Sequence, residues 1–115
     1  MNTLKNKVQL IGRLGAKAEL KSTAGGKVFT RVSMATNEIY KDANGGKVKQ
    51  TTWHNLVAWG KTAEIISKYT EKGSEVTVEG KLINREYVGK DGVKRQTTEV
   101  QVTEVLLSGN KSPAV

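Results

Sequence analysis

The sequence contains no cysteine, one histidine and one proline among its 115 residues. The lack of cysteine excludes disulfides, thiol nucleophiles and thiolate metal sites, and a single histidine excludes any site built on a histidine pair. No run of 18 apolar residues occurs, and the first seven residues contain no apolar segment. We therefore expect no membrane span, no signal peptide, no metal and no cofactor, and a cytoplasmic location.

Positive charge, by contrast, is in excess. Nineteen Lys and Arg against eleven Asp and Glu give a formal net charge of +8. A surface of this sign attracts polyanions, so a nucleic acid is the first candidate partner. The length suits one domain, which we place at residues 1–107. Residues 108–115 are small and polar, and we expect a short disordered C-terminal end there.

Five runs rich in β-branched and aromatic residues alternate with period two, and glycine clusters separate several of them. The predicted strands are Lys7–Leu14, Val28–Thr36, Thr51–Trp59, Glu75–Tyr87 and Lys94–Leu107. The alternation in the last strand shifts phase after Val102, which predicts a bulge near Thr103.

One helix is predicted over residues 62–72, where Ala63, Ile66 and Tyr69 recur at a spacing of three and Gly73 supplies a stop. Glycines inside strands, at Gly12 and Gly80, allow the sheet to bend. The fold class is therefore all-β with one short helix. The order β-β-β-α-β-β predicts a five-stranded Greek-key barrel of the oligonucleotide-binding (OB-fold) type.

No arrangement typical of catalysis is present. The sequence has no Gly-x-x-x-x-Gly-Lys phosphate loop, and both aspartates fall in predicted turns. His54 has no serine or cysteine partner at a spacing that would indicate a catalytic pair. It alternates in phase with Leu56 and Ala58, so a packed or interface histidine is several times more common than a general base in such a place. A non-enzymatic binding protein is favoured.

The two tryptophans, Trp53 and Trp59, are six residues apart in one predicted strand, so both side chains lie on the face opposite Leu56 and Ala58. Such indoles are either covered by another layer of protein or offered to a flat ligand such as an unpaired nucleobase, and spacing alone favours neither. Tyr40 and Tyr87 stand at the bases of two predicted hairpin turns.

Cationic residues alternate with these rings, as a phosphate-binding track would require. The residues concerned are Lys49, Lys61, Lys81 and Arg85. A charge run is more often only a solvated surface, but rings and cations together suit bases and phosphates. Ile11, Phe29 and Ile83 sit among polar neighbours, off the core pattern, which indicates sheet faces buried by association.

Several motifs, in a fixed order over residues 2–107, resemble the bacterial single-stranded DNA-binding protein family. They are residues 6–15 (NKVQLIGRLG), 34–38 (MATNE), 52–64 (TWHNLVAWGKTAE), 72–74 (KGS), 78–82 (VEGKL) and 98–100 (TEV). The resemblance implies an OB-fold homotetramer that wraps single-stranded DNA without sequence preference during replication, recombination and repair, in association with the nucleoid. It implies base stacking on Tyr40, Trp53, Trp59 and Tyr87, phosphate contacts from Lys7, Lys49, Lys61, Lys72 and Arg85, and a place for His54 near subunit contacts.

The sequence departs from that family at its end. The family's usual glycine- and proline-rich linker with an acidic, hydrophobic tip is absent, and residues 109–115 contain a lysine and no acidic side chain. Docking into basic pockets of partner enzymes needs such carboxylates. We therefore expect a short form of the family that does not recruit repair enzymes through a tail.

Two alternatives stay open: an RNA-binding barrel of cold-shock type, which depends on the fold alone, and a basic module that binds an acidic protein partner. The evenly spaced tryptophans with interleaved lysines favour single-stranded DNA over the protein partner, because a protein partner requires neither stacking platforms nor a phosphate track.

Overall fold

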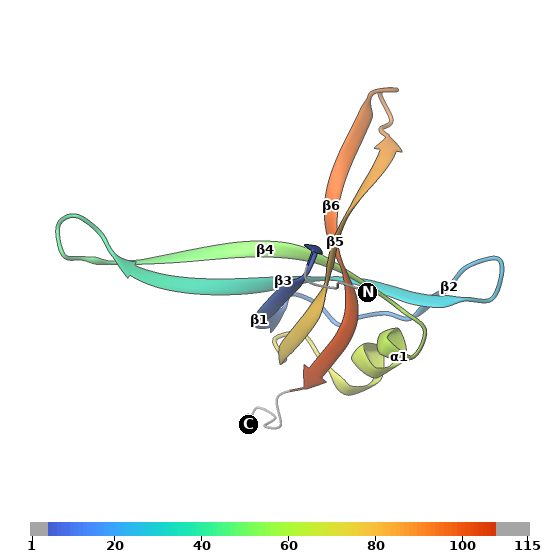
Figure 1. The fold of residues 1–115 in the computed structure, drawn as a ribbon, viewed down its shortest axis with the longest axis horizontal. Helices are drawn as coiled ribbons and strands as arrows, with labels where there is room; N and C mark the ends of the chain where they lie inside the picture. The colour runs from blue at the N-terminus through green and yellow to red at the C-terminus, as the bar shows by residue number, and fades with distance from the viewer. Residues whose placement is uncertain (1–4, 108–115) are drawn as a thin grey trace.

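Five strands form one closed barrel, and a short helix packs against it (Figure 1). The structure, a computed structural model, describes residues 5–107. Its elements are β1 (Val8–Leu14), β2 (Lys21–Ser22), β3 (Val28–Lys41), β4 (Lys47–Trp59), α1 (Gly60–Tyr69), β5 (Glu75–Val88) and β6 (Lys94–Leu107). Among these described residues, no helix has both the length and the apolar character needed to span a membrane.

The pairing of the strands closes the sheet on itself. β1 pairs with β5, β5 with β6, β6 with β4 and β4 with β3, and the end of β1 returns to β3 at Arg13 and Leu14. All these pairs are antiparallel except β4 with β6, which run parallel. The predicted all-β class with one helix and a five-stranded barrel is confirmed.

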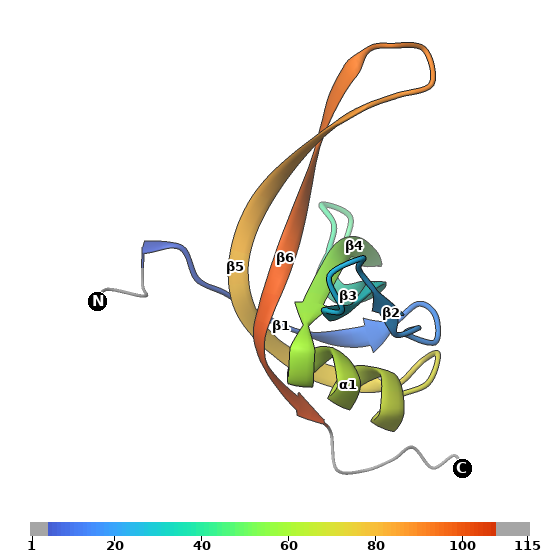
Figure 2. The same ribbon diagram turned by 90° about the vertical axis from the view of Figure 1, so that its right-hand side faces the viewer.

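The barrel interior is apolar because alternate residues of each strand point inward. Leu14, Met34, Leu56, Val78 and Val100 are among its buried side chains. α1 covers one end of the barrel (Figure 2) and adds Ala63 and Ile66 to this core. The sequence placed Leu56 and Ala58 on the core face, and both are buried there.

The helix differs from its prediction at both ends. It begins at Gly60, two residues early, and ends at Tyr69 with an extended C-cap residue, Thr70. Tyr69 is 61% exposed, because a spacing of three drifts around the helix and carries the third residue off the buried stripe. Gly73 does not cap the helix: it has a positive φ in the following turn, where its N–H donates to the Leu14 carbonyl.

Two hairpins extend well beyond the barrel, β3–β4 to the left and β5–β6 upward in Figure 1. Strands β3 and β4 run five and four residues further toward their turn than predicted. Their outer halves are exposed on both faces, so the period-two alternation that marks a half-buried strand is absent there. The two-residue strand β2 also lacks any such pattern and was not predicted.

The predicted bulge is confirmed. Glu79 lies opposite Glu104 while the next residue, Gly80, lies opposite Val102, so Thr103 is the extra residue. Its hydroxyl donates to the Glu79 carbonyl at 3.1 Å. The bulge lets Val100 and Val102 face the core together with Val105.

Gly12 and Gly80 allow neighbouring strands to come close where the barrel bends. A Cβ at Gly12 would lie 2.2 Å from the Ala35 carbonyl oxygen, and one at Gly80 would lie 2.1 Å from that of Gln101. Backbone atoms cannot yield as a side chain can, so both positions require glycine.

We predict that Gly12→Ala and Gly80→Ala each lower the free energy of unfolding by about 1–3 kcal/mol, the usual effect of forcing extra volume into a packed site. Urea unfolding measures the change. Gly25→Ala is the matched control, because the nearest atom to its Cβ would be 4.0 Å away. Equal urea midpoints for all three variants would show that the barrel accommodates a Cβ at Gly12 and Gly80 without loss of stability.

Candidate nucleic-acid interface

The outer face of the β3–β4 pair carries an aromatic and polar surface. The hairpin turns about Asn44, so residues equidistant from it lie opposite one another. Side chains two residues apart share a face. The outer face therefore presents four cross-strand pairs: Phe29 with Trp59, Arg31 with Val57, Ser33 with Asn55, and Ala35 with Trp53.

Trp59, Phe29 and Arg31 form a continuous row at one end of this face. The ring centroids of Phe29 and Trp59 are 5.0 Å apart, with the planes tilted by 33°. The Arg31 guanidinium carbon lies 5.2 Å from the Phe29 ring centroid, in cation–π range. Trp59 remains 39% exposed, so its indole is supported on one side and open on another.

Trp53 lies further along the same strand and is 61% exposed. Its six-membered ring packs beside Gly15, where a Cβ would come within 2.8 Å of the indole Cζ3. Gly15 is itself fixed by its N–H, which donates to the Ser33 carbonyl at 2.9 Å. Because Gly15 has no side chain, the exposed Trp53 indole packs directly against its backbone.

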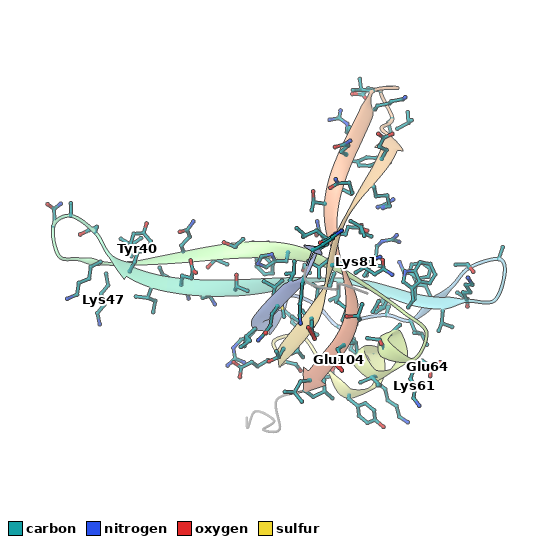
Figure 3. All side chains as sticks on the ribbon, viewed as in Figure 1. Tyr40, Lys47, Lys61, Glu64, Lys81 and Glu104 are labelled. Atoms are coloured by element: carbon teal, nitrogen blue, oxygen red, sulfur yellow. The ribbon has the colours of Figure 1, made fainter. Side chains whose placement is uncertain are left out.

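The two tyrosines lie on the projecting hairpins, where both are about half exposed. Tyr40 lies near the outer end of β3–β4 (Figure 3), where it pairs with Val48. Tyr87 pairs with Arg95 near the turn of β5–β6. Each is therefore carried well away from the core, as a contact residue for an extended ligand would be.

A groove of about 380 Å³ links the tryptophan face to Tyr87. Its lining comes from four strands: Arg31, Val32 and Ser33 of β3, Asn55 and Leu56 of β4, Arg85 and Tyr87 of β5, and Thr97 and Glu99 of β6. We call it the arginine groove. It brings together Arg85 and Tyr87, which were predicted from the sequence, with Arg31 and Asn55, which were not.

Glu99 lies at the base of the arginine groove and is almost fully buried, with 4% of its surface exposed. Arg85 Nε donates to its Oε2 at 3.4 Å, and Arg31 Nε lies 3.5 Å from the same oxygen. Oε1 is buried and has no hydrogen-bond partner in the described part of the chain. A buried carboxylate thus joins two half-exposed guanidiniums.

Two predicted phosphate ligands lie elsewhere. Lys7 and Lys81 line a second groove, of about 490 Å³, together with Lys5, Asn6, Glu79, Gly80 and Thr103. Lys7 forms an ion pair with Glu79, and the hydrogen bond from Lys7 holds the pKa of that carboxyl below its usual range. Lys7 is therefore partly neutralised by its own neighbour.

The other predicted lysines line neither groove. Lys49 is exposed on the β3–β4 hairpin opposite Ile39. Lys61 is exposed in the first turn of α1, two residues after Trp59 (Figure 3). Lys72 is exposed in the loop between α1 and β5. The predicted lysines are therefore dispersed over several elements, and none of them lines the arginine groove.

The residues predicted to lie at a subunit interface occupy three different environments. Ile11 is 56% exposed on the outer face of β1. Phe29 packs against Trp59 and so belongs to the aromatic row. His54 is half-buried, with its Nε2 3.1 Å from the Thr36 hydroxyl, and Ile83 is also half-buried.

Sequence reasoning missed Arg31, Asn55, Thr97 and Glu99. A signal for them existed, because two hairpin turns centred on Asn44 and Asp91 fix which residues lie opposite one another. Among residues 5–107, no three His, Asp or Glu side chains gather closely enough to hold a metal ion.

Known proteins provide an independent comparison. Residues 5–108 match the model of the single-strand binding protein family. A single-stranded DNA-binding protein of Xanthomonas axonopodis pv. citri is 42% identical over 106 residues, which make up 92% of this chain and 59% of that protein. One from Neisseria meningitidis serogroup A is 39% identical over 107 residues, 93% of this chain and 62% of that protein. The chain thus spans about three-fifths of the length of these relatives.

Solved structures share the fold. The Plasmodium falciparum SSB complex with ssDNA superposes with a TM-score of 0.81 at 31% sequence identity, covering 90% of this chain and 94% of that one. A deletion mutant of the single-stranded DNA binding protein from Thermus aquaticus gives a TM-score of 0.79 at 28% identity, covering 93% of this chain and 52% of that one. The barrel is therefore the OB-fold that the sequence predicted, and the chain belongs to the single-strand binding protein family.

Proposed function

We propose that this protein is a non-enzymatic binder of single-stranded DNA that protects exposed strands during replication, recombination and repair, without preference for sequence. The observation that carries the proposal is the aromatic surface of the exposed Trp53 and Trp59 and the half-buried Phe29, beside a groove that contains two arginines. The printed names of the relatives, and the DNA in the Plasmodium falciparum complex, support it.

Stacking explains why the binding would tolerate any sequence. Every base has a π-face, and stacking on an aromatic side chain is worth about 1–3 kcal/mol per base. Paired bases in a duplex offer no free faces, so the same platforms would favour single strands. Tyr40 and Tyr87, on the two projecting hairpins, would extend the contact beyond the barrel.

Phosphate contacts would supply the remaining affinity. The proposed ligands are Lys7, Lys49, Lys61, Lys72, Lys81 and Arg85, which are all exposed. They would displace condensed counterions from the strand, so binding would weaken with salt. The site of action would be the cytoplasm, in association with the nucleoid.

We propose further that the protein assembles as a homotetramer. Over Val8–Ile11, β1 pairs only with β5 among the described strands, so its other edge can accept a strand from a second copy. Ile11 lies opposite Thr77, which in turn lies opposite Leu106. Ile11 and Leu106 are 56% and 68% exposed on either side of Thr77, and association would cover these two apolar side chains.

We predict that Trp53→Ala and Trp59→Ala each weaken binding of a labelled oligothymidylate by about 1–3 kcal/mol, because each removes a stacking platform. Fluorescence anisotropy at fixed salt measures the affinity, and oligouridylate measured alongside tests the RNA alternative. Tyr69→Ala is the control, because Tyr69 is as exposed as Trp53 but lies on α1, outside both grooves. Binding that matches the parent in both tryptophan variants would assign these rings a structural role.

Salt dependence tests the phosphate contacts. The slope of log affinity against log salt is expected to flatten by up to about 0.7 for Lys61→Ala and for Arg85→Ala, the loss of one phosphate contact each. Lys68→Ala removes the same charge from the last turn of α1 and serves as the control. Slopes that fall equally in all three variants would indicate a general effect of net charge.

The assembly proposal has its own test. Ile11→Lys and Leu106→Lys are expected to shift the protein toward smaller species in sedimentation, because burial of each apolar side chain contributes about 1.5–3 kcal/mol. Ile39→Lys is the control, since Ile39 is 69% exposed on the β3–β4 hairpin. An unchanged mass in the Ile11 and Leu106 variants would exclude this face as the interface.

A further inference from the structure

We propose that Arg31 and Arg85 together form a phosphate subsite in the arginine groove, and that Glu99 is the positioning residue that holds them there. The proposal rests on the proposed binding of single-stranded DNA and specifies one contact of that site. Glu99 itself touches no DNA in this account: it acts through the two guanidiniums.

The geometry of the three side chains supports this proposal. They come from three strands, Arg31 from β3, Arg85 from β5 and Glu99 from β6. β4 lies between β3 and β6 in the sheet, so the Arg31 side chain must cross β4 to reach Glu99. The residue opposite Arg31 on β4 is Val57, which is buried although it belongs to the outer face.

Arg85 reaches Glu99 from the other side. It lies opposite Thr97, and Glu99 lies opposite Ile83, so Arg85 and Glu99 are diagonal neighbours on the same face of the β5–β6 pair. One oxygen of a fixed carboxylate thus gathers two long side chains that would otherwise be free to move apart.

The atoms through which the arginines approach Glu99 also support it. Both arginines approach Glu99 Oε2 through Nε, at 3.5 and 3.4 Å, and their Nη groups form no hydrogen bond with any residue in the range 5–107 that the structure describes. Their side chains are 41% and 46% exposed. The Nη groups are the fork that binds two oxygens of a phosphate, so the recognition part of each guanidinium stays available.

The charges of the cluster support the proposal as well. A carboxylate buried at the base of a nucleic-acid groove repels phosphates and loses hydration, and Glu99 Oε1 has no hydrogen-bond partner among the described residues to compensate. Two arginines around one glutamate still leave the cluster with a net positive charge. The unfavourable burial of the Glu99 carboxylate is explained if this group keeps the mutually repelling guanidiniums of Arg31 and Arg85 side by side.

The cluster also lies between stacking platforms. Arg31 stacks on Phe29, which contacts Trp59, and Arg85 lies two residues from Tyr87 on the same face of β5. All of Arg31, Arg85 and Tyr87 line the arginine groove. A strand with bases on Trp59 and on Tyr87 would carry an intervening phosphate past the two guanidiniums.

Glu99→Gln tests the proposal, because a positioning role and simple electrostatics predict opposite changes in DNA affinity. Removal of a negative charge would by itself strengthen DNA binding. If the Glu99 carboxylate positions the arginines, the loss of its charge weakens binding of a labelled oligothymidylate about tenfold, the value of a charge-assisted hydrogen bond. The salt slope falls as well, by up to about 0.7 for each arginine released. Equal or tighter binding with an undiminished slope would overturn the proposal.

Arg31→Lys and Arg85→Lys provide a second test that retains Glu99 and every charge, and they decide the matter if Glu99→Gln does not fold. A lysine cannot contact Glu99 and present a fork at once, so each variant is expected to bind about tenfold more weakly. Arg31→Lys is expected to add little in the Glu99→Gln background, since the charge of its partner is already lost. Parental affinity in both lysine variants would contradict the subsite.

These results separate the two proposals. If the parent protein binds oligothymidylate and the tryptophan variants weaken it while Glu99→Gln and the lysine variants do not, the subsite alone is wrong. If the parent protein does not bind oligothymidylate, the proposed function itself is wrong. Lys68→Ala again controls for a general change in surface charge.

Discussion

The antiparallel pairing of β3 with β4 determines which side chains this protein offers to a ligand. Because the hairpin turns about Asn44, Phe29 lies against Trp59 and Arg31 against Val57. A slip of one residue would reverse the faces, burying the tryptophans and exposing Leu56 and Ala58. The apolar core and the aromatic surface are thus two consequences of one register, and a shift of this register would disrupt both.

The closed barrel lets such a surface be exposed and still rigid. Closure leaves the inner face to the core, with α1 covering one end, so the outer face does not have to supply packing. Trp53 stands on a strand and against Gly15 rather than on a loop. A platform held in this way loses little conformational entropy when a base stacks on it, which suits a protein that must bind many bases in succession.

The sequence predicted the barrel, the helix and the bulge because each has a strong local signal. The bulge was visible as a phase shift between Val102 and Val105, and the tryptophan face as an even spacing. The outer halves of the hairpins carried no such signal, because strands exposed on both faces need not alternate. Glu99 was not recognised because it alternates with the core residues of its strand, and a charged residue at such a position is expected to be exposed to solvent. Its burial depends on arginines from two other strands.

The central claim is that exposed indoles stack on unpaired bases. Titration of the parent protein with oligothymidylate, with tryptophan fluorescence as the signal, tests it most directly, since Trp53 and Trp59 are the only tryptophans in the sequence. The account predicts strong quenching by the single strand and little by a duplex of equal length. Tight binding of the single strand without quenching, or equal quenching by the duplex, would contradict it.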